Sequence, residues 1–300
     1  MSLPNFIIIG AVRSGTTSVY EYLRQHPQVF MCPFKQTNFF ISDLEKPIFN
    51  GPRGSILNRE RVDNLEDYQA LFNGVRSEHA IGEASPRYLF TPGTANRIKQ
   101  LLPDVTLLAI LRNPIDRAFS EYSMSKREGL EPCDSFVEAL ADQERRLREQ
   151  WAFCEYINKG FYSCQIEEYY KCFNRAQIHV YLFEDLIQNT AGLLQNIFKI
   201  IGVDQNFIPD TSKKYNASGL IKNPVLRVLW TRTQPARSIV GAIVPKNFRE
   251  GAQRFFAMRT LAKLELIPEV RDHLLDIYRE DILKLQDLIN RDLSAWLGKP

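Results

Sequence analysis

The sequence has few of the residues that build disulfide frameworks and metal centres. Its 300 residues include five cysteines and four histidines. The cysteines are odd in number, no two form a C-x-x-C pair, and the histidines are widely scattered. This pattern argues against a disulfide scaffold and a structural zinc site. We therefore expect a reducing, cytoplasmic compartment and no metal centre built from these cysteines and histidines.

Long hydrophobic runs are also missing. No apolar stretch approaches the ~20 residues needed to cross a bilayer, so we expect no transmembrane segment. The first residues show no basic region, apolar run and cleavage site in succession, so we expect no signal peptide. There is no internal repeat, and the composition, 44% hydrophobic and 24% charged, is typical of a globular protein. We expect a single domain over residues 1–300.

The small net charge of +3 conceals one strongly basic segment. Residues 213–263 contain eleven lysines and arginines against a single acid, Glu250. Trp230, Phe255 and Phe256 stand among these charges. The segment is typical either of a solvated cationic surface or of a helical lid, over about 220–265, that meets an anionic partner.

The most informative motif follows the first apolar run. Phe6–Ile9 is typical of a buried parallel strand, and Gly10 and Gly15 bracket a tight loop before a helix. A glycine loop between a strand and a helix N-terminus presents backbone N–H groups and the helix dipole to one anion. The spacing fits G-x-x-x-x-G-K-[ST], except that Thr16 replaces the lysine and Arg13 lies inside the loop. The loop predicts a site for a phosphate-like group.

Strands and helices alternate along the chain, which predicts an α/β fold. We expect strands at 6–10, 29–31, 79–83, 105–111 and 177–183, and helices at 16–25, 65–73, 91–102, 115–128, 134–151, 164–172, 190–201 and 268–291. This order predicts a parallel sheet flanked by helices, with ligands at the carboxyl ends of its strands. Arg13, Glu83 and Arg112 each lie at or beyond such an end, so we expect them at one edge of the sheet.

A second anion motif follows the strand at 105–111. Arg112 leaves this strand where Asn113-Pro114 begins a helix, and Ser120 lies two turns along that helix. The planar arginine fork suits a phosphate, and a serine hydroxyl adds a donor. Together with the first loop, the motif predicts two anionic groups on one ligand.

Arg13-Ser-Gly-Thr-Thr17 combined with Arg112-Asn-Pro and Ser120 resembles the sulfotransferase family, with the heparan-type and bacterial members as the nearer pattern. Further matching segments run through the chain: His26-Pro27, Phe39-Phe40, 82–88, Gly160-Phe-Tyr162, 183–186, 216–219 and 291–297. The resemblance implies a nucleotide-kinase-like P-loop fold. It also implies 3′-phosphoadenosine 5′-phosphosulfate (PAPS) as sulfuryl donor and co-substrate, with 3′-phosphoadenosine 5′-phosphate (PAP) as product.

In that family the first loop holds the 5′-phosphosulfate, and the strand-end arginine and the serine eight residues later hold the 3′-phosphate. The nucleotide-binding residues that the resemblance implies here are Arg13, Ser14, Gly15, Thr16, Thr17, Ser18, Arg112, Ser120, Tyr162, Lys214, Asn216 and Ser218.

The missing lysine fits this chemistry. A sulfuryl group carries less charge than a phosphoryl group, so no magnesium ion is needed to bridge it. Loop N–H groups, Arg13 and the Thr16 and Thr17 hydroxyls can stabilise the charge that gathers on the leaving 5′-phosphate. A small-molecule kinase is a weaker hypothesis, because the loop lysine and a magnesium-binding acid after a strand are both missing.

One position departs from the family pattern. A glutamate three residues before the Phe-Phe pair is the usual general base, and here that position is Gln36. A glutamine amide can orient an acceptor hydroxyl but cannot take its proton. Glu83, a strand-end carboxylate expected to face the same cleft, is the favoured base, with a structural role as its alternative. A further explanation is an acceptor that needs little help from a base. Lys35 is a candidate contact for the sulfuryl oxygens, or a solvated lysine.

The acceptor side stays open at the level of sequence. The basic and apolar segment suits an anionic or amphiphilic acceptor: a small molecule, a lipid, an acyl chain on a carrier protein or, ranked lower, a glycan. No nucleic acid partner is expected. The reacting group is expected to be a hydroxyl, less often an amine. The alternative function is a protein that binds PAPS or PAP with little or no transfer, because Gln36 replaces the base.

Overall fold

The computed structural model describes residues 2–41, 50–51, 62–151, 155–212, 220–221, 261–262 and 265–298. Most of the basic segment and of the expected lid at 220–265 lies outside these residues. Within it, β6 (Leu220–Ile221) and β7 (Leu261–Ala262) pair as an antiparallel two-stranded ribbon.

The centre of the molecule is a five-stranded parallel sheet in the order β2-β3-β1-β4-β5. Its strands are β1 (Phe6–Gly10), β2 (Val29–Met31), β3 (Ala80–Ala84), β4 (Thr106–Leu111) and β5 (Ile178–Leu182). β1 and β4 lie inside the sheet and are almost fully buried, which agrees with their unbroken apolar sequences. The predicted parallel α/β sheet is confirmed.

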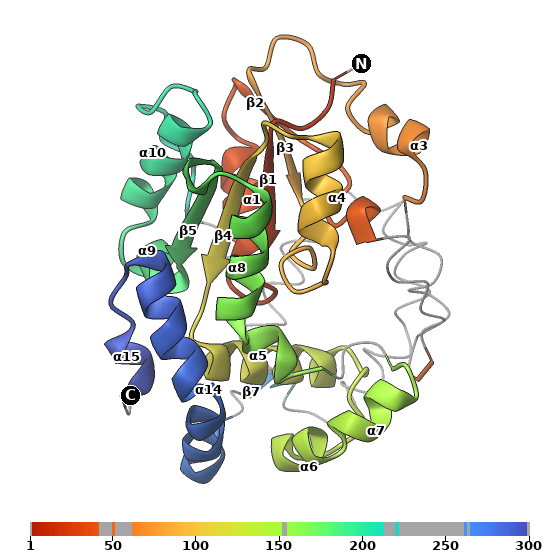
Figure 1. The fold of residues 1–300 in the computed structure, drawn as a ribbon, viewed down its shortest axis with the longest axis vertical. Helices are drawn as coiled ribbons and strands as arrows, with labels where there is room; N and C mark the ends of the chain where they lie inside the picture. The colour runs from red at the N-terminus through yellow and green to blue at the C-terminus, as the bar shows by residue number, and fades with distance from the viewer. Residues whose placement is uncertain are drawn as a thin grey trace.

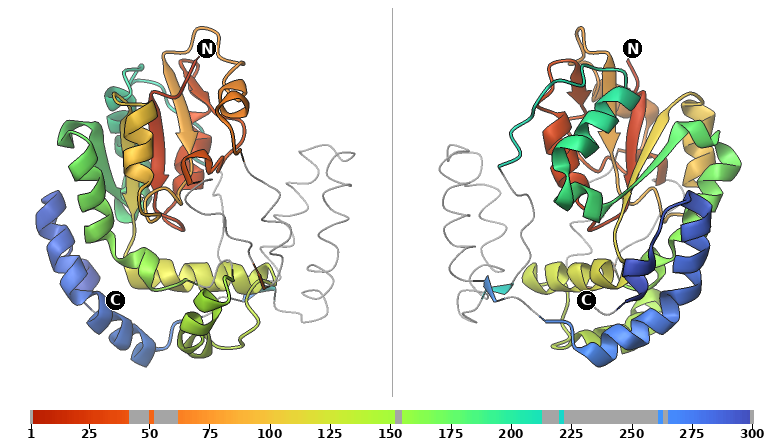
Figure 2. Two further views of the ribbon diagram at one scale, coloured as in Figure 1. Left: turned by 45° about the vertical axis from the view of Figure 1, so that its right-hand side comes forward. Right: turned by 90° about the vertical axis from the view of Figure 1, so that its left-hand side faces the viewer.

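Helices cover both faces of this sheet (Figures 1 and 2). The α-helices are α1 (Thr16–Leu23), α3 (Leu65–Ala70), α4 (Thr94–Leu101), α5 (Pro114–Arg127), α6 (Phe136–Ala141), α7 (Gln143–Arg148), α8 (Tyr162–Cys172), α9 (Phe183–Gln188), α10 (Thr190–Ile200), α14 (Pro268–Ile289) and α15 (Ser294–Leu297). Short 3₁₀ turns occur at Phe39–Ile41, Asn158–Gly160 and Arg175–Gln177.

The alternation of side chains along β1 divides the core into two layers. Ile7 and Ile9 face a layer built with residues of α4, α5, α8 and α14, whereas Phe6 and Ile8 face one built with α1 and α10. Parallel strands buried on both faces bring all their carboxyl ends to one edge. In Figure 1 this edge points toward α5, which crosses beneath the sheet.

The local sequence explains where α5 begins. The Asn113 Oδ1 atom accepts hydrogen bonds from the backbone N–H of Ile115 (3.0 Å) and of Asp116 (3.4 Å), and Pro114 occupies the first helical position. This cap fixes the chain direction directly after Arg112.

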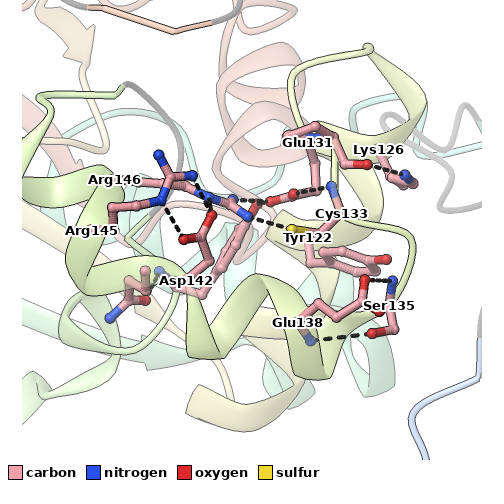
Figure 3. A network of polar contacts seen from close by, with 12 residues as sticks. Tyr122, Lys126, Glu131, Cys133, Ser135, Glu138, Asp142, Arg145 and Arg146 are labelled. Atoms are coloured by element: carbon pink, nitrogen blue, oxygen red, sulfur yellow. Dashed lines mark hydrogen bonds and ion pairs between the residues drawn. The ribbon is translucent and has the colours of Figure 1, made fainter.

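The region predicted as one helix over 134–151 is instead two short helices. α6 begins with a capping box between Ser135 and Glu138 and ends at Asp142, where α7 starts. A network of ion pairs and hydrogen bonds between side chains surrounds α6, α7 and the end of α5 (Figure 3). In it Arg146 donates to Glu131 (2.6 Å) and to Asp142 (2.8 Å), and the Arg146 and Glu131 side chains are almost fully buried. Because its charges are mutually satisfied, this network is a structural support.

Candidate active site

The loop between β1 and α1 has the geometry of an anion site. Gly15 adopts φ 83°, a left-handed conformation that favours glycine, and α1 begins immediately after it. Gly15, the N-cap residue of α1, has no side chain that could cap the helix. The N–H groups of Thr16 and Thr17 precede Ser18, whose N–H donates to the Gly15 carbonyl at 2.9 Å, so these two have no acceptor within the helix and suit an external one.

Arg13 joins the two anion motifs predicted from the sequence. It adopts φ 67° within the loop. Its Nε donates to the Ser120 Oγ at 3.2 Å, and its carbonyl oxygen accepts from the Arg112 Nη1 at 3.2 Å. Residues more than 90 positions apart in sequence thus meet at one place, as the strand-end argument predicts.

The electrostatics of this meeting point are strongly positive. Burial and, to a smaller extent, the nearby charge of Arg127 together lower the pKa of Arg13 to about 10. Burial also lowers the pKa of Arg112. Within the described part of the chain, no carboxylate forms an ion pair with Arg13, Arg112 or Lys35. Partly desolvated cations that form no direct ion pair with a described carboxylate favour binding of an anionic ligand.

An aromatic ring that the sequence argument missed supports Arg112. The guanidinium carbon lies 4.7 Å from the centroid of the Phe183 ring, at the first residue of α9. Stacking on an aromatic face holds the guanidinium plane in one orientation. The matching segment at 183–186 contained this signal, but nothing in the sequence paired it with Arg112.

Lys35 and Gln36 stand at the edge of the same site. The Lys35 Nζ donates to the Thr17 Oγ1 at 2.8 Å, and burial lowers the pKa of Lys35 to about 8. Gln36 has an exposed side chain and φ 64°. Its backbone N–H donates to the Ala84 carbonyl at 2.9 Å, which ties this segment to β3.

The expectation that Glu83 faces the cleft is wrong. Its side chain is fully buried. The carboxylate accepts four hydroxyl hydrogen bonds, from Thr37 (2.6 Å), Tyr68 (2.6 Å), Ser85 (2.7 Å) and Tyr88 (2.8 Å). Burial and the neighbouring Glu83 charge raise the pKa of both tyrosines well above its usual value, so their hydroxyls remain donors. Glu83 therefore has the geometry of a structural carboxylate, the alternative weighed from the sequence.

Tyr162 is the first residue of α8. The ring is fully buried, and burial raises the pKa of its hydroxyl to about 12, although Arg117 and the Ser14 hydroxyl act in the opposite direction. The Tyr162 hydroxyl is therefore near the Ser14 hydroxyl of the loop. Ser14 and Thr16 are also buried, whereas Thr17 and Ser18 are partly exposed at the start of α1.

The remaining predicted nucleotide contacts, Lys214, Asn216 and Ser218, lie outside the described residues. Within the residues that the structure describes, no group of three or more histidine, cysteine or carboxylate side chains is arranged to hold a metal ion. In the same part of the chain, every helix is too short or too polar to cross a bilayer.

Known proteins are similar to this chain in sequence and in fold. The model described as "Sulfotransferase family" matches residues 4–207. A crystal structure of a sulfotransferase from Alicyclobacillus acidocaldarius is 33% identical, covers 99% of this chain and 100% of its own, and superposes with a TM-score of 0.80.

Curated relatives match over shorter regions. The membrane-associated sulfotransferase kil1 of Dictyostelium discoideum is 33% identical over 153 residues, which are 50% of this chain and 30% of kil1. The heparan sulfate glucosamine 3-O-sulfotransferase 3B1 of Mus musculus is 26% identical over 206 residues, 67% of this chain and 46% of that enzyme. The chain thus spans less than half the length of these two relatives. The family match, the full-length structural likeness and the two joined anion motifs together place this chain in the sulfotransferase family.

Proposed function

We propose that this protein transfers a sulfuryl group from PAPS to a hydroxyl, less often an amine, of an acceptor. The observation that carries the proposal is the position of Arg13. Its guanidinium bonds Ser120 while its carbonyl bonds Arg112, and none of the described carboxylates pairs with it. A single positive site thus unites the loop suited to the 5′-phosphosulfate with the arginine suited to the 3′-phosphate.

In the proposed reaction, an acceptor oxygen forms a bond to sulfur while the bond from sulfur to the 5′-phosphate oxygen breaks. The acceptor gives up its proton to solvent water, because the Gln36 amide cannot accept it and Glu83 is fully buried, and the 5′-phosphate leaves as PAP with the negative charge of the broken bond. Arg13, Lys35 and the N-terminus of α1 lie where they can stabilise that charge. Loss of one such preorganised donor typically costs about 10²–10³ in rate. The reaction as proposed requires no metal ion.

The acceptor is proposed only as a class. The basic and apolar composition of residues 213–263 favours an anionic or amphiphilic molecule, such as a lipid or a carrier-bound acyl chain. One relative is named for its action on heparan sulfate glucosamine, which keeps a glycan among the candidates. A screen for transfer of ³⁵S from labelled PAPS to lipid, glycan and carrier-bound acyl acceptors would identify the class.

A second function, nucleotide binding with little transfer, is favoured by Gln36 and Glu83. Gln36 occupies the position of the usual base, and Glu83 is sealed by four hydroxyl donors. The Gln36→Glu variant separates the two functions. A gain of turnover that the parent lacks supports the binding protein, whereas turnover by the parent supports the enzyme.

Calorimetric titration with PAP in the presence of EDTA tests the donor site. We expect binding without metal, and an Arg112→Ala variant that loses much of its affinity for PAP but little for adenosine 5′-monophosphate (AMP), which lacks the 3′-phosphate. Arg148→Ala is the matched control, since the Arg148 side chain is 74% exposed and lies on α7. Binding that requires magnesium, or equal losses for both nucleotides, would contradict the proposal.

A further inference from the structure

The C-terminal helix α14 packs against α5 (Figure 1), and Trp296 of α15 bonds Asn113, the residue that follows Arg112. Both helices are beyond residues 4–207, the region that the family model matches. Trp296 of α15 is almost fully buried there. The structure therefore places a segment from the end of the chain beside a predicted phosphate contact.

Trp296 forms hydrogen bonds with the residues that directly follow Arg112 and Phe183, the stacked pair. Its carbonyl oxygen accepts from the Asn113 Nδ2 at 3.3 Å, and its indole Nε1–H donates to the Glu184 Oε1 at 3.1 Å. Asn113 directly follows Arg112, and Glu184 directly follows Phe183, the ring on which Arg112 rests. Trp296 thus connects the residue next to Arg112 with the residue next to Phe183.

Two carboxylates act electrostatically on Arg112, and each is held by a C-terminal residue. The charges of Asp116 and Glu184 oppose the effect of burial on the pKa of Arg112. Asp116 forms an ion pair with Arg271 of α14, and Glu184 accepts the Trp296 indole hydrogen bond. Neither carboxylate forms an ion pair with Arg112 in the described part of the chain. A freed carboxylate this close would compete with an anionic ligand for the guanidinium.

We propose that Trp296 and Arg271 are positioning residues that keep Glu184 and Asp116 away from Arg112, so that its guanidinium remains open to the 3′-phosphate. This inference rests on the proposed function, because it assigns the 3′-phosphate to Arg112. It means that the C-terminal segment contributes to the preference of the protein for a nucleotide with a 3′-phosphate.

The first experiment measures dissociation constants of Trp296→Phe for PAP and for AMP by calorimetry, on the full chain. Phenylalanine keeps an aromatic ring in the core but removes the indole donor. We expect affinity for PAP to fall about 5- to 10-fold, less than the loss of a direct hydrogen bond to a charged group would cause, because Trp296 acts on Arg112 only through Glu184. Affinity for AMP should change less than about twofold. Trp151→Phe is the matched control and should change neither value, because Trp151 packs by Arg145 and Arg146.

A second pair of variants tests the mechanism without touching the buried tryptophan. The first variant is Arg271→Gln, at a side chain that is 19% exposed. It should also weaken the binding of PAP more than the binding of AMP. The double variant Arg271→Gln with Asp116→Asn should recover the affinity for PAP, because no freed carboxylate remains. Failure to recover would overturn the role of Arg271.

A double-mutant cycle distinguishes a positioning role from a merely structural one. In an Arg112→Ala background, Trp296→Phe should cause no further loss of PAP affinity, because its effect passes through Arg112. Equal weakening of PAP and AMP by Trp296→Phe, or a full loss in the Arg112→Ala background, would overturn the inference. If the parent protein binds no PAP at all, the proposed function fails instead, so the two failures are distinguishable.

Discussion

Single residues of this protein carry charges whose surroundings determine what they can do. Lys35 and Glu83 show opposite cases. Lys35 is partly exposed beside the anion loop, and its amine reaches Thr17. Glu83 is buried, and its carboxylate is enclosed by hydroxyl donors. The same edge of the sheet therefore contains one charge available to a ligand and one charge committed to the fold.

The affinity for PAP is expected to fall as pH rises through about 8. Burial lowers the pKa of Lys35 to about 8, so the free protein loses this positive charge above that pH. A bound anion favours the protonated amine and raises its pKa, so binding weakens where the free amine is neutral. If binding raises the pKa by about one unit, affinity falls roughly fivefold between pH 7 and pH 9, a range that ends below the pKa of about 10 of Arg13. Calorimetric titrations across this range measure the effect.

Lys35→Arg is the control for this pH dependence, because the ordinary pKa of a guanidinium lies above 12, far above the pH near 8 at which Lys35 titrates. The comparison stays at pH 9 or below, since the pKa of Arg13 is lowered to about 10. The variant should show a flatter affinity profile than the parent. An unchanged slope in Lys35→Arg would show that another group titrates.

Replacing Glu83 is expected to destabilise the protein. In Glu83→Gln the amide group presents N–H donors where hydroxyls now donate, which leaves at least one buried hydroxyl without an acceptor. A loss of about 1–3 kcal/mol in the free energy of unfolding follows, measured by urea denaturation. Glu144→Gln is the control, at a side chain that is 87% exposed, and should change the free energy of unfolding by less than about 0.5 kcal/mol. Full stability of Glu83→Gln together with abolished turnover would restore Glu83 as the general base.

At the scale of elements, the turn from β1 into α1 depends on a close approach by α9. A Cβ atom on Gly15 would lie 2.5 Å from the Leu186 Cδ2 atom and 3.1 Å from the Phe183 ring. α9 therefore packs directly against the anion loop while its first residue supports Arg112. The two phosphate motifs share this helix as a common support.

Gly15→Ala should impair both folding and nucleotide binding. The substitution forces alanine to φ 83° and creates a clash with α9, which together cost about 2–4 kcal/mol. Gly202→Ala is a matched control, since Gly202 has φ 74° but no atom within 4 Å of an added Cβ. We expect the thermal midpoint and the PAP affinity to fall clearly further in Gly15→Ala than in Gly202→Ala. Similar losses in both variants would mean that the clash with α9 is unimportant.

At the scale of the whole molecule, nucleotide binding should stabilise the entire fold. The site combines the loop after β1, the start of α5 and the first turn of α9, which the C-terminal helices hold in place. A ligand that binds all of them must be released before the domain unfolds.

PAP at about 100 times its dissociation constant should add about 2.7 kcal/mol to the stability and raise the thermal midpoint by roughly 5–10 °C. The increase should be the same in EDTA and in magnesium, and smaller in high salt, because the contacts are ionic. Thermal denaturation followed by fluorescence measures it, with adenosine as the uncharged control. A midpoint that rises only with magnesium would contradict the proposed metal-independent site.

The sequence by itself determined the sheet, the glycine loop and the position of Arg13 and Arg112 at one edge of the sheet. Unbroken apolar runs, a glycine loop and a helix cap act over a few neighbouring residues, so their pattern is visible along the chain. Parallel topology then brings strand ends to one edge. The orientation of Glu83, the Phe183 stack and the Trp296 contacts were decided only by the tertiary structure. Each depends on which partners from distant segments desolvate a group and supply its hydrogen bonds, and local spacing does not specify those partners.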